Sequence, residues 1–93
     1  MNRLLIKSSA FGRTAKRLLK KNPSLAVDIQ TTLELLSEDA FHPSLKTHKL
    51  KGNLEGSWAC SVAYDLRIIF EFVQHDESEA ILLEAIGSHD EVY

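Results

Sequence analysis

The sequence predicts one α+β domain over residues 1–93, in the order β-α-α-β-β-β, with an antiparallel sheet and a helical hairpin packed on one of its faces. Between positions 57 and 73, large apolar residues alternate with small or polar ones, which is the two-residue period of a strand. Between positions 9 and 36, apolar residues recur every third or fourth position, as in amphipathic helices. No helix is left for the second sheet face, so we expect that face to be open to solvent or to a partner.

The N-terminal half is expected to form a short strand and two helices. The strand is predicted at 3–7, and the first helix follows an N-cap at Ser8 or Ser9 and ends before Pro23. Ser24 is expected to cap the second helix, and the short connection predicts that the two helices pack as an antiparallel hairpin. The apolar positions are Phe11, Ala15, Leu18 and Leu19 in the first helix and Leu25, Ile29, Leu33 and Leu36 in the second, widened there by Val27 and Leu35.

The C-terminal half is expected to form a loop, a hairpin and one further strand. Pro and Gly residues interrupt any periodicity between 37 and 56, which indicates a loop that carries a basic cluster. Two strands follow over 57–73 with a tight turn near Tyr64-Asp65, and the last strand is predicted at 79–86. The final segment, 87–93, is then expected to leave the sheet edge.

Strand alternation also predicts which side chains share a face of the sheet. Val62, Ile68 and Phe70 are expected to point toward the helices, and Ser61, Ala63, Arg67 and Ile69 toward the open face. An Arg beside small side chains indicates a shallow site for an anion, because its guanidinium presents a fork of donors. The alternative is a structural ion pair between Arg67 and Glu71 or Glu84.

Charge is distributed unevenly along the chain, although the net charge is only −2. Every charged residue in the first 21 positions is basic, whereas Arg67 is the only Lys or Arg after Gly52. A basic helix face favours contact with phosphates. The simpler alternative is a helix face that is merely solvated.

Other features of the composition limit the possible classes of protein. A single Cys excludes an internal disulfide and fits a reducing cytoplasm. No apolar run is long enough for a signal peptide or a membrane span, so we expect a cytoplasmic protein without membrane association. The His residues and Cys60 lack metal-ligand spacing, so no metal is expected. Cys60 is expected to face the core, which argues against a Cys-His nucleophile pair.

Four segments appear in an order that is typical of one family. They are the short strand with its helical hairpin, K-x-H-x-L-x-G at 46–52, YDLRIIFEF at 64–72 and the ending GSHDEVY. Together they extend over nearly the whole chain, which resembles bacterial type II toxins of the RelE/ParE superfamily and is nearest to the RelE and YafQ branches. The resemblance implies a RelE-like fold.

The resemblance also implies an activity. Many such toxins are ribosome-dependent endoribonucleases, or mRNA interferases, and each is held inactive by a cognate antitoxin. The ribose 2′-OH attacks the adjacent phosphate and leaves a 2′,3′-cyclic phosphate and a 5′-OH, without a metal or a small-molecule cofactor. This chemistry needs a base, a cation for the developing negative charge and an acid for the leaving oxygen.

The family's functional residues match positions of this chain. His89 takes the place of the C-terminal catalytic residue and is expected to be the general acid, with a polar tail residue without a role as the alternative. Arg67 matches the Arg that stabilises the phosphate. Asp65 matches a proposed base, with a plain turn residue as the alternative. His48 matches a loop His that assists the reaction, with one more residue of a solvated basic loop as the alternative. Tyr93 matches the terminal aromatic that stacks on an mRNA base, with an aromatic closing the core as the alternative.

Contacts to RNA and the ribosome are expected from the basic residues of the first helix and of the loop. These residues are Arg13, Lys16, Arg17, Lys20, Lys46, Lys49 and Lys51. One departure weakens the nuclease assignment, because Ser61 stands where YafQ-like toxins carry a His. Two alternatives therefore stay open: a ParE-like toxin that inhibits DNA gyrase, and a catalytically weakened toxin-fold binding module. The antitoxin is expected to cover either the helices or the open sheet face.

Overall fold

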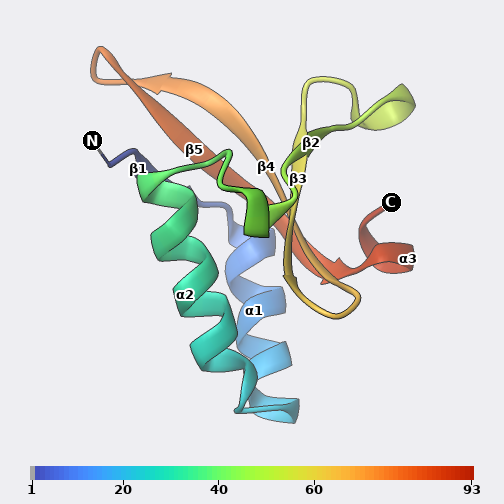
Figure 1. Cartoon of the computed structure of the whole chain (residues 1–93). Coiled ribbons are helices and arrows are strands. Elements are labelled where there is room, and N and C mark those ends of the chain that lie inside the picture. The colour runs from blue at the N-terminus through green and yellow to red at the C-terminus, as the bar shows by residue number, and fades with distance from the viewer. Residues whose placement is uncertain (1) are drawn as a thin grey trace.

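The computed structural model describes residues 2–93 and confirms the α+β class (Figure 1). Its five-stranded sheet has the order β1-β5-β4-β3-β2. The strands are β1 (Leu4–Lys7), β2 (His48–Lys49), β3 (Trp58–Ala63), β4 (Leu66–His75) and β5 (Ser78–Ser88). The helices are α1 (Ser9–Lys21), α2 (Leu25–Glu38) and α3 (His89–Val92), with single 3-10 turns at Pro43–Leu45 and Gly52–Leu54.

The predicted antiparallel sheet is wrong at one edge. β1 runs parallel to β5, with Leu4 opposite Ala80, whereas the other neighbouring strands are antiparallel. Parallel neighbours need a long connection, and here the whole helical hairpin and the rest of the sheet lie between β1 and β5. The apolar residues of β1 therefore predicted where this strand lies in the sequence, but not that it runs parallel to its neighbour β5.

Two segments that were expected to be irregular contain short elements. Within the predicted loop, β2 pairs with β3, and His48 lies opposite Ala59. After β5, the chain forms α3 instead of simply leaving the sheet edge. Both elements are too short to produce a periodic pattern, so apolar spacing could not predict them.

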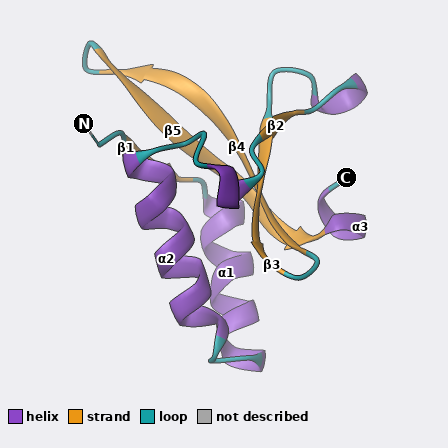
Figure 2. Cartoon of the chain, in the orientation of Figure 1, coloured by secondary structure: helices purple, strands orange, loops and turns teal. Residues whose placement is uncertain are grey.

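The helical hairpin lies on one side of the sheet, as predicted (Figure 2). Ser8 caps α1, because its Oγ accepts a hydrogen bond from the backbone N–H of Phe11 at 3.0 Å. Ser24 makes no such bond to α2 and donates to Asn22 Oδ1 instead, at 2.6 Å. Val27 does not widen the apolar seam and is 70% exposed, because it lies half a turn away from the buried stripe. No helix within residues 2–93 is long and apolar enough to span a membrane.

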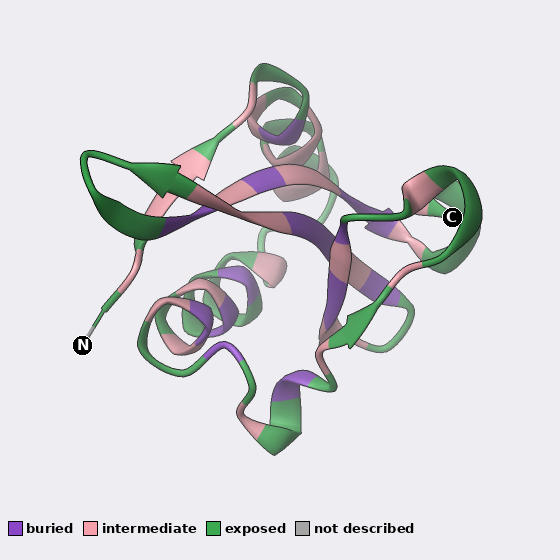
Figure 3. Cartoon of the chain, turned by 90° about the horizontal axis from the view of Figure 1, so that it is seen from above, coloured by how far each residue is buried: buried purple, intermediate pink, exposed green. Residues whose placement is uncertain are grey.

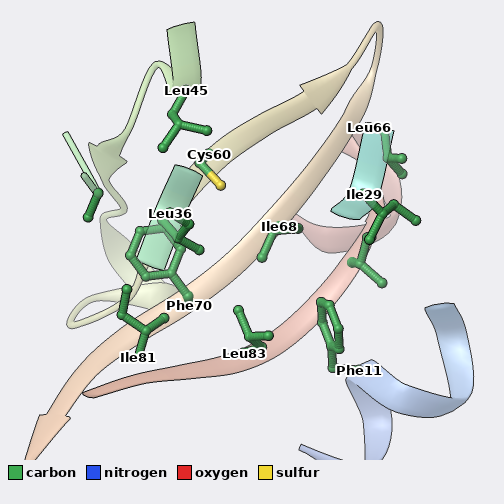
Figure 4. Packing of buried hydrophobic residues seen from close by; sticks show 12 residues of the cluster. Phe11, Ile29, Leu36, Leu45, Cys60, Leu66, Ile68, Phe70, Ile81 and Leu83 are labelled. Carbon is green, nitrogen blue, oxygen red and sulfur yellow. The ribbon is translucent and has the colours of Figure 1, made fainter. Parts of the chain in front are cut away.

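The core lies between the hairpin and the sheet, and it confirms the predicted alternation (Figure 4). Phe70 and Ile68 of β4 are fully buried against Phe11 of α1 and Leu36 of α2. Val62 packs at the margin of the same cluster. This packing fixes the register of β3 and β4, because a slip of one residue would turn their apolar side chains to the other face.

The face away from the hairpin is less open than predicted. Ile69 and Ala59 belong to that face, yet they are 3% and 0% exposed and lie outside the main core cluster. β2 extends the sheet beside Ala59, and α3 packs back against β4 and β5. Figure 3 shows the strands buried in the middle of the molecule and exposed at the β4–β5 turn. The covered part adjoins the β3–β4 turn, where the predicted site residues lie.

Candidate active site

A cleft opens at the end of the sheet where β3 turns into β4. On one side lie Ser44 of the first 3-10 turn and Lys46, which follows that turn, and on the other side lies α3. The floor and walls are formed by Ser44, Lys46, Ser61, Val62, Ala63, Tyr64, Asp65, Arg67, His89 and Asp90. Three residues that the sequence assigned to catalysis, Asp65, Arg67 and His89, thus share one cleft.

Arg67 supplies the fixed positive charge of the cleft. It lies on β4 between Ser61 of β3 and Gly87 of β5, and its half-buried side chain lines the cleft. Nη1 reaches only the carbonyl oxygens of Ala63, at 3.4 Å, and Leu66, at 3.3 Å. No carboxylate in the described part of the chain forms an ion pair with Arg67.

The alternative of a structural ion pair with Glu71 or Glu84 is therefore wrong. Glu84 instead accepts a hydrogen bond from Ser57 Oγ, at 2.7 Å. A half-buried guanidinium without a carboxylate partner retains most of its donors for an incoming anion.

Asp65 and His89 meet across the mouth of the cleft. Asp65 adopts a left-handed conformation with φ +57° in the β3–β4 turn, a region that Asp tolerates better than most residues. Its Oδ1 accepts a hydrogen bond from the backbone N–H of His89 at 3.3 Å. The imidazole of His89 stays exposed, with Nδ1 3.7 Å from Asp90 Oδ1.

A capping box forms the start of α3 and so places His89. Ser88 Oγ accepts from the N–H of Glu91 at 3.2 Å, and Glu91 Oε1 accepts from the N–H of Ser88 at 2.8 Å. The hydrogen bond from the backbone N–H of Ser88 is the largest cause that lowers the pKa of the Glu91 carboxyl. The positive charges of Arg17 and Lys21 on α1 lower that pKa to a smaller extent.

His48 joins this group through Tyr93. Its Nδ1 is 2.9 Å from the carbonyl oxygen of Lys46, and because a carbonyl can only accept, Nδ1 carries the proton in the neutral ring. Nε2 then accepts from the Tyr93 hydroxyl at 3.2 Å. The Tyr93 ring also meets the His89 ring edge to face, with centroids 4.2 Å apart.

Tyr93 is a donor rather than an anion in this arrangement. Partial burial is the largest cause that raises the pKa of its phenol above 10.0, although the charge of Arg67 opposes the rise. Contacts thus link four of the five residues predicted to be catalytic: Asp65 to His89, His89 to Tyr93 and Tyr93 to His48. Arg67 shares the cleft with Asp65 and His89, whereas His48 and Tyr93 do not line it.

A family model described as the bacterial toxin of a type II toxin-antitoxin system, YafQ, matches residues 4–93, which is almost the whole chain. The chain belongs to the YafQ toxin family. The resemblance stated from the sequence is thereby confirmed. A comparison with curated protein sequences gave no significant match.

Solved toxin structures share the fold of this YafQ-family chain. YafQ from E. coli strain BL21(DE3) is 19% identical, aligns over 98% of each chain and has a TM-score of 0.77. The YoeB/ParE toxin from Agrobacterium tumefaciens is 13% identical, aligns over 92% of this chain and 98% of that one, and has a TM-score of 0.78. A chain of the E. coli DinJ-YafQ toxin-antitoxin complex is 20% identical over 100% of this chain and 99% of that one, with a TM-score of 0.75. Identities this low establish the fold alone.

The basic residues of this YafQ-family toxin that were predicted to contact RNA or the ribosome are all exposed. They are Arg13, Lys16, Arg17 and Lys20 on α1, and Lys46, Lys49 and Lys51 around β2. Lys46 differs from the others because it lines the cleft itself, in a left-handed conformation with φ +53°. Lys49 lies over the Trp58 ring, with Nζ 5.6 Å from its centroid.

Sequence reasoning missed some members of the toxin's cleft. Ser44 and Asp90 line it, and Lys46 had been assigned only to general RNA contacts. One signal for α3 was present, because Ser88 and Glu91 have the S-x-x-E spacing of a capping box. Ser61 lines the cleft and lies opposite Arg67.

Cys60 of the toxin is fully buried, and burial is the main cause that raises its pKa from 9.0 to about 12. The thiol therefore stays protonated at neutral pH, which excludes a Cys-His nucleophile pair.

We expect iodoacetamide to leave Cys60 unmodified in the native protein at about pH 8 and to alkylate it readily in urea. Equal rates in the two conditions would contradict the burial of this side chain.

The same shift of pKa predicts how stability depends on pH. The pKa of Cys60 is higher in the folded protein than in the unfolded chain. The contribution of Cys60 to the free energy of unfolding is therefore complete below pH 9.0 and is lost as the pH rises toward 12. Urea unfolding at increasing alkaline pH should show this loss, and Cys60→Ala should reduce it.

Proposed function

We propose that this toxin is a ribosome-dependent endoribonuclease that cleaves mRNA by attack of a ribose 2′-OH on the adjacent phosphate, without a metal. The bond from phosphorus to the 5′-oxygen breaks, which yields a 2′,3′-cyclic phosphate and a 5′-OH. The observation that carries the proposal is the unpaired cation of Arg67, in one cleft with His89 and Asp65. A phosphate needs such a cation, and the leaving oxygen needs a proton donor nearby.

Arg67 would bind the non-bridging oxygens of the scissile phosphate. Charge builds on these oxygens during the attack, and the guanidinium can hold two of them at once. Ser61 and Gly87 flank Arg67 on the neighbouring strands, and neither carries a side chain that would block a phosphate from this face. Lys46, on the opposite wall, would add a second positive charge.

His89 would donate a proton to the departing 5′-oxygen. Imidazole is the side chain best suited to exchange a proton near neutral pH, and the His89 ring is exposed at the cleft mouth. Two residues are candidates for accepting the proton of the 2′-OH: His48, whose Nε2 is a hydrogen-bond acceptor, and Asp65. Tyr93 lies between the two imidazoles, where its ring would stack on a base of the mRNA.

The basic residues of α1 would contact ribosomal RNA. Replacing Lys16, Arg17 and Lys20 with Glu is expected to weaken ribosome binding at about 0.1 M salt by at least tenfold and to reduce its salt dependence, because fewer counterions are released. Binding to purified ribosomes at several salt concentrations measures both effects. Lys7→Glu, a charge reversal of the same sign on β1, is the control. Equal affinity of the two variants for the ribosome would show that the α1 residues form only a solvated surface.

The partners of this activity would be the ribosome with its mRNA and a cognate antitoxin. A toxin of this kind acts where translation takes place, in the cytoplasm. An antitoxin is supported by the E. coli structure in which DinJ and YafQ form a complex. Copurification with the product of a neighbouring short gene would identify it.

The test is to map new 5′ ends on an mRNA during translation in a reconstituted system. Ends within codons that appear only when the toxin and ribosomes are both present would support the proposal. Intact mRNA would reject it, and a parallel assay of gyrase supercoiling would then detect the ParE-like alternative. Intact mRNA together with unchanged supercoiling would favour the remaining alternative, a toxin-fold binding module without catalysis.

A further inference from the structure

We propose that Asp65 is a positioning residue, which holds α3 and thereby His89 in place, rather than the base that accepts the 2′-OH proton. This inference rests on the proposed nuclease function for its kinetic consequence. The carboxylate already has a partner: Oδ1 accepts the backbone N–H of His89 at 3.3 Å. That N–H belongs to the first turn of α3 and has no partner inside the helix.

α3 needs such external contacts because it is only four residues long. A single helical turn is unstable in water, since it orders several residues for very few hydrogen bonds. Side chains bind three of the first N–H groups of this segment: those of Ser88 and Glu91 within the capping box, and that of His89 through Asp65. Asp65 is the only one of these side chains that comes from another part of the chain, so it ties α3 to the β3–β4 turn.

Gly87 allows this close packing. A Cβ at position 87 would lie 3.1 Å from Val92 Cγ1 and 3.2 Å from Glu91 Cβ, so α3 rests directly on the backbone of β5. Gly87 is also the register partner of Arg67. The contact therefore fixes the distance between the phosphate-binding cation and the imidazole of His89.

The far end of α3 is held by the bond from Tyr93 to His48. Asp65, Gly87, the capping box and Tyr93 thus form one set of contacts around His89. The backbone of Asp65 supports the same role, because its φ of +57° in the turn directs the side chain to the helix. Its carboxylate is exposed at the turn, and its described hydrogen bond is the one from the N–H of His89.

Asp65→Asn separates the two roles. The amide keeps an oxygen that can accept the N–H of His89 and tolerates the left-handed turn, but it cannot take a proton. We expect Asp65→Asn to lower kcat for mRNA cleavage by no more than about threefold, and Asp65→Ala to lower it by about 10- to 100-fold through misplacement of His89. The pH profile of Asp65→Asn should keep every limb of the wild-type profile.

Asp76→Asn is the matched control for these variants. Asp76 is exposed and also has a positive φ, +48°, but it lies in the β4–β5 turn, away from the cleft. Its substitution is expected to leave cleavage unchanged. Gly87→Ala, which adds only a methyl group beneath α3, is expected to resemble Asp65→Ala, whereas Gly12→Ala meets no atom within 4 Å and is its control.

A second readout does not depend on activity. Backbone order parameters of residues 89–92 in the isolated protein should fall below about 0.6 in Asp65→Ala and stay near 0.85 in the wild type and in Asp65→Asn. If the wild type does not cleave mRNA, the nuclease proposal fails, and these order parameters still decide the positioning role. The inference is overturned if Asp65→Asn loses as much activity as Asp65→Ala, or if α3 stays ordered in Asp65→Ala.

Discussion

Arg67→Ala is expected to lower the rate of mRNA cleavage on the ribosome by about 10²- to 10³-fold, the usual cost of removing one donor that stabilises a developing negative charge. Arg67 has no carboxylate partner among residues 2–93, so its charge is not needed to neutralise another group of the fold. Its hydrogen bonds to the carbonyl oxygens of Ala63 and Leu66 are long, at 3.4 and 3.3 Å. The free energy of unfolding should therefore change by only about 0.5 kcal/mol.

Single-turnover cleavage and urea unfolding measure these two quantities on the same variant. Arg67→Lys keeps the charge but loses the fork of donors, and it should recover only part of the rate. Lys7→Ala removes an exposed charge outside the cleft and is the control. Full activity in Arg67→Ala would show that the phosphate does not bind at this guanidinium.

His89→Ala is expected to lower kcat by about 10²- to 10⁴-fold, the usual contribution of a general acid. The side chain is exposed and lies at the start of α3, so its removal leaves the core unchanged. Ribosome binding should stay at the wild-type level, because the basic residues of α1 and β2 are intact. Cleavage rate and ribosome affinity, measured separately, distinguish a defect of chemistry from a defect of binding.

The control for His89 is His75→Ala. His75 is also exposed and lies beside an acidic residue, Asp76, with 3.4 Å between Nε2 and Oδ2, but it is the last residue of β4, away from the cleft. Its removal should not affect cleavage. A general acid also predicts that His89→Ala removes the limb of the pH-rate profile on which activity falls as the pH rises. A profile of unchanged shape in His89→Ala would contradict that role.

The fold was predictable wherever apolar spacing extends over several turns or strand residues. Ser8 as the cap of α1, the turn at Tyr64-Asp65 and the alternation of Arg67 with Ile68 all follow from local patterns. The direction of β1 was not predictable, because a short apolar strand has the same residue pattern whether its neighbour is parallel or antiparallel. Val27 was misassigned because its apolar character was counted without its angle around α2.

The residues proposed for the site were selected from the sequence, whereas their arrangement was not. Resemblance to a family selected His48, Asp65, Arg67, His89 and Tyr93, and the fold brings these five together. The contacts among them depend on backbone geometry that no residue pattern encodes. The burial of the face around Ile69 is an example, since α3 packs back against β4 and β5.

In the proposed reaction the ribose 2′-OH is the nucleophile, and this cleft catalyses its attack. The most direct measurement uses an mRNA with a single 2′-deoxy nucleotide on the 5′ side of a mapped cleavage site. With the wild-type toxin on translating ribosomes, we expect no cleavage at that position, while the unmodified mRNA yields a 2′,3′-cyclic phosphate and a 5′-OH. Cleavage of the 2′-deoxy mRNA at the normal rate, or fragments with a 5′-phosphate, would contradict the mechanism.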